Sequence, residues 1–201
     1  MALSFLAAAM LSWKKMGPTM MTTSRLRTNR RVWSARLAGA VIAVLALIWT
    51  AAYALEPLPA PTGPIILLVS GNIEITNTPE GAAFDREMLY ALGKSTVVTM
   101  TSWTDGDQIF EGVLARAVME RVGASGTTAI ASALNDFVAP VPMAEIKKYD
   151  VLLATEMNGK QMTVSDKGPI WIVYPRNDHP ELQDSKFNDR WVWQLKELRV
   201  E

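Results

Sequence analysis

The feature that most restricts the fold of this chain is an uncharged apolar run over residues 37–55 (LAGAVIAVLALIWTAAYAL). It is at the lower limit of the length that an α-helix needs to span a bilayer. The run follows a basic segment, residues 24–36, and ends in Ala52-Tyr53-Ala54, which places small residues at positions −3 and −1 of a signal-peptidase site. A proline-rich stretch, residues 56–61, then stops any helix. A water-exposed domain must therefore fold from the residues that follow.

The order of these segments predicts a signal peptide over residues 1–54, cleaved after Ala54, and a Pro-rich linker over residues 55–63. An uncleaved N-terminal membrane anchor is the alternative. Basic residues before a span keep that side in the cytoplasm, so both interpretations place the following domain in the periplasm. The arginine pair in residues 29–33 (NRRVW) is similar to a twin-arginine signal, which leaves both folded export and the general route open.

The formal net charge of zero is the sum of two unlike parts. Residues 1–54 contain seven of the 20 basic residues and no acidic residue. The other 147 residues therefore contain 13 basic and 20 acidic residues, which gives them a net charge of −7. Nucleic-acid-binding domains usually carry a basic excess, so we expect no nucleic-acid partner for this acidic domain.

Cysteine is absent from the chain, and His179 is its only histidine. The lack of cysteine excludes disulfides, thiol nucleophiles and metal centres that depend on thiolate ligands. A single histidine makes histidine-rich metal sites impossible and gives little support to a Ser-His-Asp site.

The exported part shows short strand and helix patterns without a regular βαβ alternation. It predicts about seven strands within residues 65–69, 73–76, 96–101, 127–139, 151–157, 160–164, 169–174 and 190–200, and helices at residues 84–92, 113–122 and 143–148. Residues 65–76 are expected to form a hairpin at Gly71-Asn72, and Asn158-Gly159 is the strongest hairpin signal. The predicted class is α+β: one mainly antiparallel β-sheet domain with about three short helices, over residues 64–201.

Three segments in order resemble the molybdopterin-binding domain of the sulfite oxidase family. They are residues 103–123, in which Phe110-Glu111-Gly112-Val113 opens the predicted helix, residues 150–159 (DVLLATEMNG) and residues 168–175 (GPIWIVYP). The closing Arg190-Trp191-Val192-Trp193 is also similar to the last strand of that family. The resemblance implies the family's fold, an oxidoreductase activity and molybdopterin as cofactor.

In that family the thiolate of a cysteine at a strand end binds molybdenum, and the resemblance places this position within residues 99–103 (TMTSW). No cysteine stands there. Met100 offers only a neutral thioether, whereas Thr101 and Ser102 offer hydroxyl oxygens with very high pKa values. The metal, if bound, is then expected to have an oxygen ligand or no protein ligand, so no metal-ligating or catalytic residue is assigned.

Cofactor contacts are expected at this strand end and in the loop after the Gly-Pro strand, from Met100, Thr101, Ser102, Trp103, Arg176, Lys186 and Arg190. The indole of Trp103 offers a flat surface for a pterin ring. The three cations suit an anionic ligand because they cluster in a loop of an otherwise acidic domain. The alternatives are structural: core packing for Met100 and Trp103, local hydrogen bonds for the hydroxyls and solvation for the cations.

Two functions from different classes remain open. The first is a periplasmic molybdopterin-dependent oxidoreductase. The second is a non-catalytic module that keeps the family's pocket, binds a small-molecule or pterin-type ligand, and docks on a membrane-bound sensor or redox partner. The missing thiolate favours the second, and molybdenum content distinguishes the two.

Overall fold

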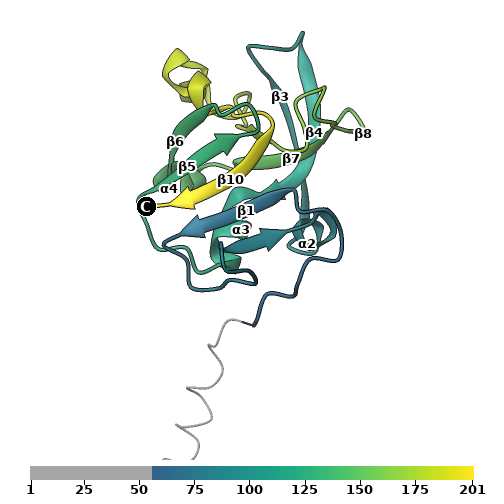
Figure 1. Ribbon diagram of the computed structural model, residues 1–201. Helices are drawn as coiled ribbons and strands as arrows, with labels where there is room; N and C mark the ends of the chain where they lie inside the picture. Colours follow the sequence, from purple (N-terminus) through teal and green to yellow (C-terminus); the bar gives the residue numbers. More distant parts are fainter. Residues whose placement is uncertain (1–55) are drawn as a thin grey trace, which may run out of the picture. The chain divides into compact units, whose positions relative to one another are not determined.

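The computed structural model describes residues 56–201, and the predicted signal peptide lies outside the described residues. Two sheets make up this domain (Figure 1). The strands are β1 (Leu67–Gly71), β2 (Ala82–Phe84), β3 (Lys94–Met100), β4 (Asp107–Leu114), β5 (Thr128–Ala133), β6 (Val138–Pro142), β7 (Leu152–Met157), β8 (Lys160–Gln161), β9 (Trp171–Val173) and β10 (Leu195–Val200). The helices are α2 (Arg86–Tyr90), α3 (Ala115–Arg121), α4 (Met143–Lys148) and the 3-10 helices η2 (Pro180–Gln183) and η3 (Ser185–Arg190).

The first sheet has the strand order β2-β1-β10-β5-β6. Its central pair, β1 and β10, is parallel and joins the start of the domain to its C-terminal strand, with Leu68 opposite Glu197. The other pairs in this sheet are antiparallel. Because β10 lies between β1 and β5, this sheet forms only when both ends of the domain are in place.

The second sheet has the order β3-β4-β7-β8, and β9 pairs with β7. Figure 1 shows β3 and β4 as a long hairpin whose tip projects at one end of the domain. Asn158 and Gly159 both have positive φ angles, 51° and 72°, as the turn between β7 and β8 requires. Gly112 lets β7 approach closely, since a Cβ there would lie 2.1 Å from the carbonyl oxygen of Leu153.

Short helices connect the strands, and local signals fix their ends. The carboxylate of Asp85 accepts a hydrogen bond from Met88 N and caps α2, which ends just before Gly93 at φ 105°. Helix α3 ends before Gly123 at φ 63°, and α4 begins after Pro142. None of the helices in residues 56–201 is long and apolar enough to cross a membrane.

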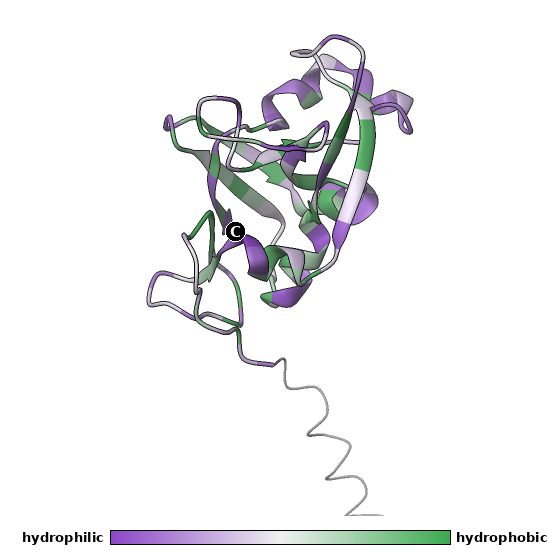
Figure 2. Cartoon of the chain, turned by 90° about the vertical axis from the view of Figure 1, so that its right-hand side faces the viewer, coloured by the Kyte–Doolittle hydropathy of each residue, from purple (hydrophilic) through white to green (hydrophobic). Residues whose placement is uncertain are grey.

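The core is apolar and continuous across both sheets. Figure 2 shows the apolar colour mainly on the strands and the polar colour mainly on the short helices and on some of the turns. The largest fully buried side chains of the core include Trp171, Trp191, Tyr174, Phe84 and Phe110. Aromatic side chains bury the most area per residue, so this group contributes much of the hydrophobic stabilisation.

The segment predicted as a linker is packed against the domain. Leu58 is only 8% exposed, and the carbonyl oxygen of Pro57 accepts a hydrogen bond from Arg121 Nη2 at 3.0 Å. Further along, Thr62 N and Gly63 N both donate to Asp85 Oδ2, at 2.8 and 2.9 Å. The chain is therefore fixed to the domain from Pro57 onward.

The predicted α+β class with mainly antiparallel sheets is confirmed, and α4 has the predicted bounds. The hairpin predicted for residues 65–76 is wrong, because residues 73–76 form no strand and β1 pairs with β2 and β10 instead. The helix predicted to open at Phe110-Glu111-Gly112-Val113 is also misplaced. These four residues belong to β4, and the helix starts at Ala115.

The last predicted strand is shorter than expected, because Trp191 and Trp193 precede β10 and lie outside any strand. Strand β8 is likewise shorter than the predicted residues 160–164. Both errors come from alternating apolar residues in segments that do not join a ladder, since Trp191 is buried by side-chain packing and Val164 is 52% exposed.

Candidate functional site

The end of β3 and the loop after β9 meet through side-chain hydrogen bonds to backbone. The hydroxyl oxygen of buried Thr99 accepts hydrogen bonds from Arg176 N at 3.0 Å and Asn177 N at 3.3 Å. In return, Asn177 Oδ1 accepts a hydrogen bond from Met100 N at 3.0 Å. This exchange brings the two segments that the sequence singled out into contact.

Arg176 is the charged centre of this junction and is only 6% exposed. Its Nε donates to the carbonyl oxygen of Leu182 at 3.1 Å, Nη1 to Ser102 Oγ at 2.9 Å, and Nη2 to Asn188 Oδ1 at 2.6 Å. All three acceptors are neutral, and no carboxylate of the described residues pairs with this guanidinium. Burial lowers the pKa of Arg176 from its usual value, but arginine starts so high that it stays protonated.

Four tryptophans pack together beside Arg176. The ring of Trp103 contacts those of Trp171, Trp191 and Trp193, with centroids 6.3, 6.0 and 5.5 Å away. The guanidinium carbon of Arg176 lies 5.1 Å from the ring centroid of Trp191. Edge-on and tilted contacts of this kind are the favoured geometries for aromatic rings, so the cluster is a stable wall.

The segment after η3 holds two of these tryptophans because it runs along β9. Val192 O accepts a hydrogen bond from Ile172 N at 2.9 Å, and Trp171 Nε1 donates to Trp191 O at 3.3 Å. Gln194 next to Trp193 has a positive φ of 55°, and its N donates to the carbonyl oxygen of Lys167 at 2.9 Å. This turn sets the direction in which Trp193 leaves the backbone.

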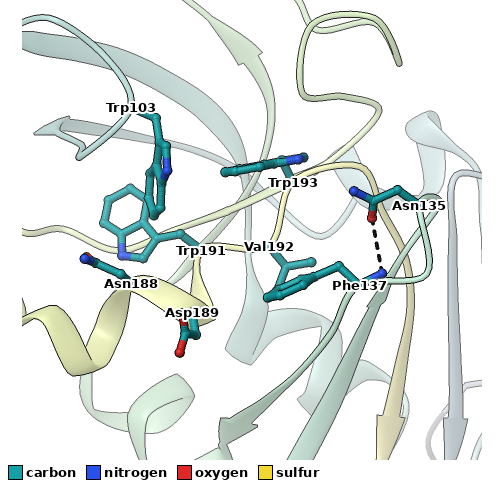
Figure 3. A pocket seen from close by; sticks show the side chains of 8 residues that line it. All are labelled: Trp103, Asn135, Phe137, Asn188, Asp189, Trp191, Val192 and Trp193. Carbon is teal, nitrogen blue, oxygen red and sulfur yellow. Dashed lines mark hydrogen bonds between the residues drawn. The ribbon is translucent and has the colours of Figure 1, made fainter.

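A cavity of about 220 Å³ lies against this wall (Figure 3). It is lined by Trp103, Asn135, Phe137, Asn188, Asp189, Trp191, Val192 and Trp193. Figure 3 shows Trp103, Trp193 and Phe137 around one space, with Asn188 and Asp189 at the side of η3. Phe137 and Trp103 are 46% and 37% exposed, so aromatic surface is open to a ligand there.

One buried donor in this wall has no partner among residues 56–201. The indole Nε1 of Trp191 is inaccessible to solvent and makes no hydrogen bond, although the residue is only 2% exposed. Asn188 is its neighbour, since Trp191 N donates to Asn188 O at 3.1 Å, and Figure 3 shows the Asn188 amide beside the indole nitrogen. The single acceptor of that amide, Oδ1, is already taken by Arg176.

The structure brings together three of the seven predicted contact residues, Ser102, Trp103 and Arg176. Thr101 lies next to them, but its hydroxyl is engaged with Thr104 Oγ1 at 2.8 Å and Trp103 N at 3.0 Å. Met100 is 44% exposed and does not line the cavity.

The other two predicted cations are occupied by carboxylates. Lys186 Nζ lies 3.0 Å from Asp184 Oδ2 on an exposed surface. Arg190 forms an ion pair with Glu145 of α4 and packs over the ring of Phe187. Neither residue lines the cavity, and their part in cofactor contact stays a prediction.

Sequence reasoning missed most of the cavity lining. Asn188 and Asp189 gave no motif, and Val192 belonged to a closing motif that indicated only a strand. Asn135 and Phe137 fell within the strand region predicted over residues 127–139. A signal did exist in the short spacing of Asn188, Trp191 and Trp193, which places amide and indole groups on one short segment. Within residues 56–201 no cluster of three or more acidic or histidine side chains could hold a metal ion.

Comparisons with known proteins agree with the fold. The sulfane dehydrogenase SoxCD from Paracoccus pantotrophus matches with a TM-score of 0.50 and 18% identity, which shows the fold alone. The match covers 67% of this chain and 37% of that chain, so this chain spans well under half of the length of that protein. No curated protein matches. The model of the oxidoreductase molybdopterin binding domain matches residues 74–177, just over half of the chain, and the chain belongs to this family.

Proposed function

We propose that this protein is an exported, non-catalytic binding module that keeps the family's fold and holds a small ligand in the aromatic cavity. The observation that carries the proposal is Arg176, a buried cation with neutral partners only, next to a cavity walled by indole rings. Burying an unpaired charge is costly, so proteins usually keep one where a ligand uses it.

The residues at the end of β3 fit a thiolate-ligated molybdenum centre poorly. The whole chain lacks the cysteine that would supply the ligand. The hydroxyl of Thr101 is engaged in local hydrogen bonds, and Ser102 Oγ already accepts a hydrogen bond from Arg176. Ser102 is the one oxygen near the cavity wall that a metal-bound form of this domain would use.

The size and charge of the cavity also favour a ligand other than the complete molybdopterin cofactor. Its volume of about 220 Å³ is below the range of roughly 300–1,000 Å³ that is typical of sites for drug-sized ligands. Lys186 and Arg190, which would neutralise an anionic cofactor, are paired with Asp184 and Glu145. A ligand smaller than a complete pterin cofactor suits this site better.

The cavity has the composition of a binding site. Aromatic and aliphatic surface lines most of it, and two amides, Asn135 and Asn188, supply polar groups at its edge. An apolar pocket with a few placed polar groups is the usual form of a small-molecule site. Holding a ligand requires no thiolate and no metal, so the function survives the loss of the family's cysteine.

Export is the second part of the proposal. The basic, apolar and Ala-Tyr-Ala segments before residue 55 support it, and the acidic balance of the remaining residues suits a water-exposed domain. In the periplasm such a module would pass its ligand state to a membrane-bound sensor or redox partner. Figure 1 shows the projecting β3–β4 hairpin, which carries exposed Val98 and Ile109 as a cross-strand pair that such a partner could contact.

The test is elemental analysis for molybdenum, together with pterin fluorescence, on protein purified from its native host. We expect far less than one molybdenum atom per chain while a molybdenum enzyme of the same host, purified in parallel, is fully loaded. Stoichiometric molybdenum would overturn the proposal and establish the oxidoreductase, with Ser102 as the first ligand to examine. The Ser102→Ala variant then tests this ligand, because the substitution removes molybdenum only if Ser102 binds the metal.

A further inference from the structure

Hydrogen-bond donors outnumber acceptors around Arg176. Its guanidinium has five N–H groups, and three of them bond to Leu182 O, Ser102 Oγ and Asn188 Oδ1. The nearby indole N–H of Trp191 has no acceptor. The amide N–H groups of Asn188 also make no hydrogen bond to any described residue. An acceptor with negative charge is the group that this arrangement lacks.

We propose that the ligand of the cavity is a small aromatic carboxylate, with its carboxylate on the amide of Asn188, in front of Arg176, and its ring between Trp103, Trp193 and Phe137. This inference rests on the proposed function, because it names the ligand class of the same cavity. It adds a polar subsite that neither the family match nor the sequence assigns.

The charge at this subsite favours a carboxylate over a neutral carbonyl. Asn188 Oδ1 accepts a short hydrogen bond from Arg176, 2.6 Å long, which polarises the amide and makes its N–H groups stronger donors. The positive charge of Arg176 lies directly behind this amide and has no carboxylate partner of its own. Charge-assisted hydrogen bonds are roughly twice as strong as neutral ones, so the anion gains most here.

The shape of the cavity favours a single aromatic ring behind the carboxylate. Three aromatic side chains border the space in Figure 3, and Val192 adds an aliphatic surface. Offset and edge-on contacts with indole rings stabilise a flat ring beyond the area it buries. A volume of about 220 Å³ accommodates one ring with a short acid arm.

Asp189 is the one acidic side chain of the lining, and it opposes an anion. It is exposed at the rim on η3, and Figure 3 shows its carboxylate turned away from the indole rings. Water and salt screen an exposed charge far more than a buried one, so Arg176 outweighs it. The other nearby cations, Lys186 and Arg190, are paired with Asp184 and Glu145 and add little net charge.

The experiment compares acids with their uncharged amides by isothermal titration calorimetry on the purified protein. The probes are benzoate, phenylacetate and indole-3-acetate against benzamide, phenylacetamide and indole-3-acetamide. We expect at least one acid to bind at least tenfold more tightly than its amide, with the difference shrinking as salt is added. If every amide binds as well as its acid, or if none of the six binds, the inference is overturned.

Two matched variants keep the test valid if one of them is unstable. Asn188→Asp keeps an acceptor for Arg176 but removes the amide N–H groups at the cavity, whereas Asn135→Asp makes the same change at the other amide of the lining. We expect Asn188→Asp to reduce the preference for acid over amide to below threefold, and Asn135→Asp to preserve it. Equal effects of the two variants on this ratio would contradict the subsite.

Variants of Arg176 complete the design. Arg176→Lys keeps the charge and is expected to retain part of the acid preference, whereas Arg176→Gln removes the preference while amide binding persists. Failure of the carboxylate inference can be distinguished from failure of the proposed function. Binding of amides alone leaves a non-catalytic module with another ligand, whereas loaded molybdenum refutes the module itself.

Discussion

The guanidinium of Arg176 and the indole of Trp191 lie against each other with 5.1 Å between the guanidinium carbon and the ring centroid. Both are almost fully buried, yet the cation has only neutral partners and the indole N–H has none. Stability alone does not account for such a pair, because each unsatisfied group raises the free energy of the folded state. The position of Arg176 behind the Asn188 amide, at the wall of the aromatic cavity, accounts for the unpaired charge if a ligand supplies an anion there.

Arg190 is predicted to be structural. Its ion pair with Glu145 is mostly buried, and Glu145 Oε2 also accepts a hydrogen bond from Tyr174 OH at 3.1 Å. We expect Glu145→Gln to cost about 1–2 kcal/mol of unfolding free energy because one charged partner is lost. A double-mutant cycle with Arg190→Met, followed by urea denaturation, should show coupling of at least about 0.5 kcal/mol. No coupling, combined with loss of ligand affinity in Arg190→Met, would instead place Arg190 in the binding site.

Gly112→Ala is predicted to destabilise the domain strongly. The new Cβ would lie 2.1 Å from the carbonyl oxygen of Leu153, and backbone of a central strand cannot move away without breaking the ladder. We expect a loss of about 2–4 kcal/mol, measured by thermal or chemical denaturation. Gly159→Ala is the control. Its Cβ meets nothing within 4 Å, so the cost there is only about 1 kcal/mol from the positive φ.

Asp85 is predicted to make stability depend on acid pH. Hydrogen bonds from Met88 N, Gly63 N and Thr62 N to its carboxylate hold its pKa below the usual value. A lowered pKa in the folded state stabilises the fold above the unfolded value of about 3.9, and this contribution disappears as the pH falls through the folded pKa. Asp85→Ala should therefore cost about 2–4 kcal/mol at pH 7, and the difference from wild type should narrow below about pH 4.

Asp136→Asn provides the comparison for Asp85, because asparagine also tolerates the positive φ of 64° at this position. The Asp136 side chain is 91% exposed and makes one surface ion pair with Lys196, so we expect little loss of stability. Unfolding curves at several pH values between 3 and 7 check both variants. A constant difference between Asp85→Ala and wild type over this range would show that the carboxylate charge is not what stabilises α2 and the segment around Thr62 and Gly63.

The mature N-terminus is predicted to be Leu55. The Ala52-Tyr53-Ala54 motif favours signal-peptidase cleavage after Ala54, and the chain is fixed to the domain from Pro57 onward. Mass spectrometry of protein from the periplasmic fraction should find a chain that begins at Leu55. Intact residues 1–54 in a membrane fraction would identify an anchor, and intact protein in the cytoplasm would refute export.

The fold class was predictable because strand and helix signals are local. Asn158-Gly159, Gly93 and Gly123 fix turns and helix ends through their own backbone conformation, so they are visible in the sequence. The parallel pairing of β1 with β10 was not predictable, because it joins segments at opposite ends of the domain. Strand β4 was missed because its start is polar and exposed, and the helical spacing of the residues after it dominates the pattern.

The site was predictable only in part. Ser102, Trp103 and Arg176 were found through the resemblance, since they follow the strands that bear its motifs. The pairing of Arg190 with Glu145 was not visible, because Glu145 lies on a helix distant in sequence from Arg190. Lys186 pairs with Asp184, which is only two residues away, so that pair was within reach of the sequence. The unpaired indole N–H of Trp191 depends on the exact position of Asn188 and Arg176 in space.

The most direct test of the account is the pair of side-chain amide ¹⁵N–¹H resonances of Asn188 in the uniformly labelled protein, assigned with the Asn188→Asp variant. We predict that phenylacetate shifts these resonances downfield by a larger amount than any other side-chain amide resonance, because the N–H groups gain a charged acceptor. Phenylacetamide at the same occupancy should shift them less. Asn188 resonances that stay in place while phenylacetate binds would contradict the account, because the amide would then have no part in holding the ligand.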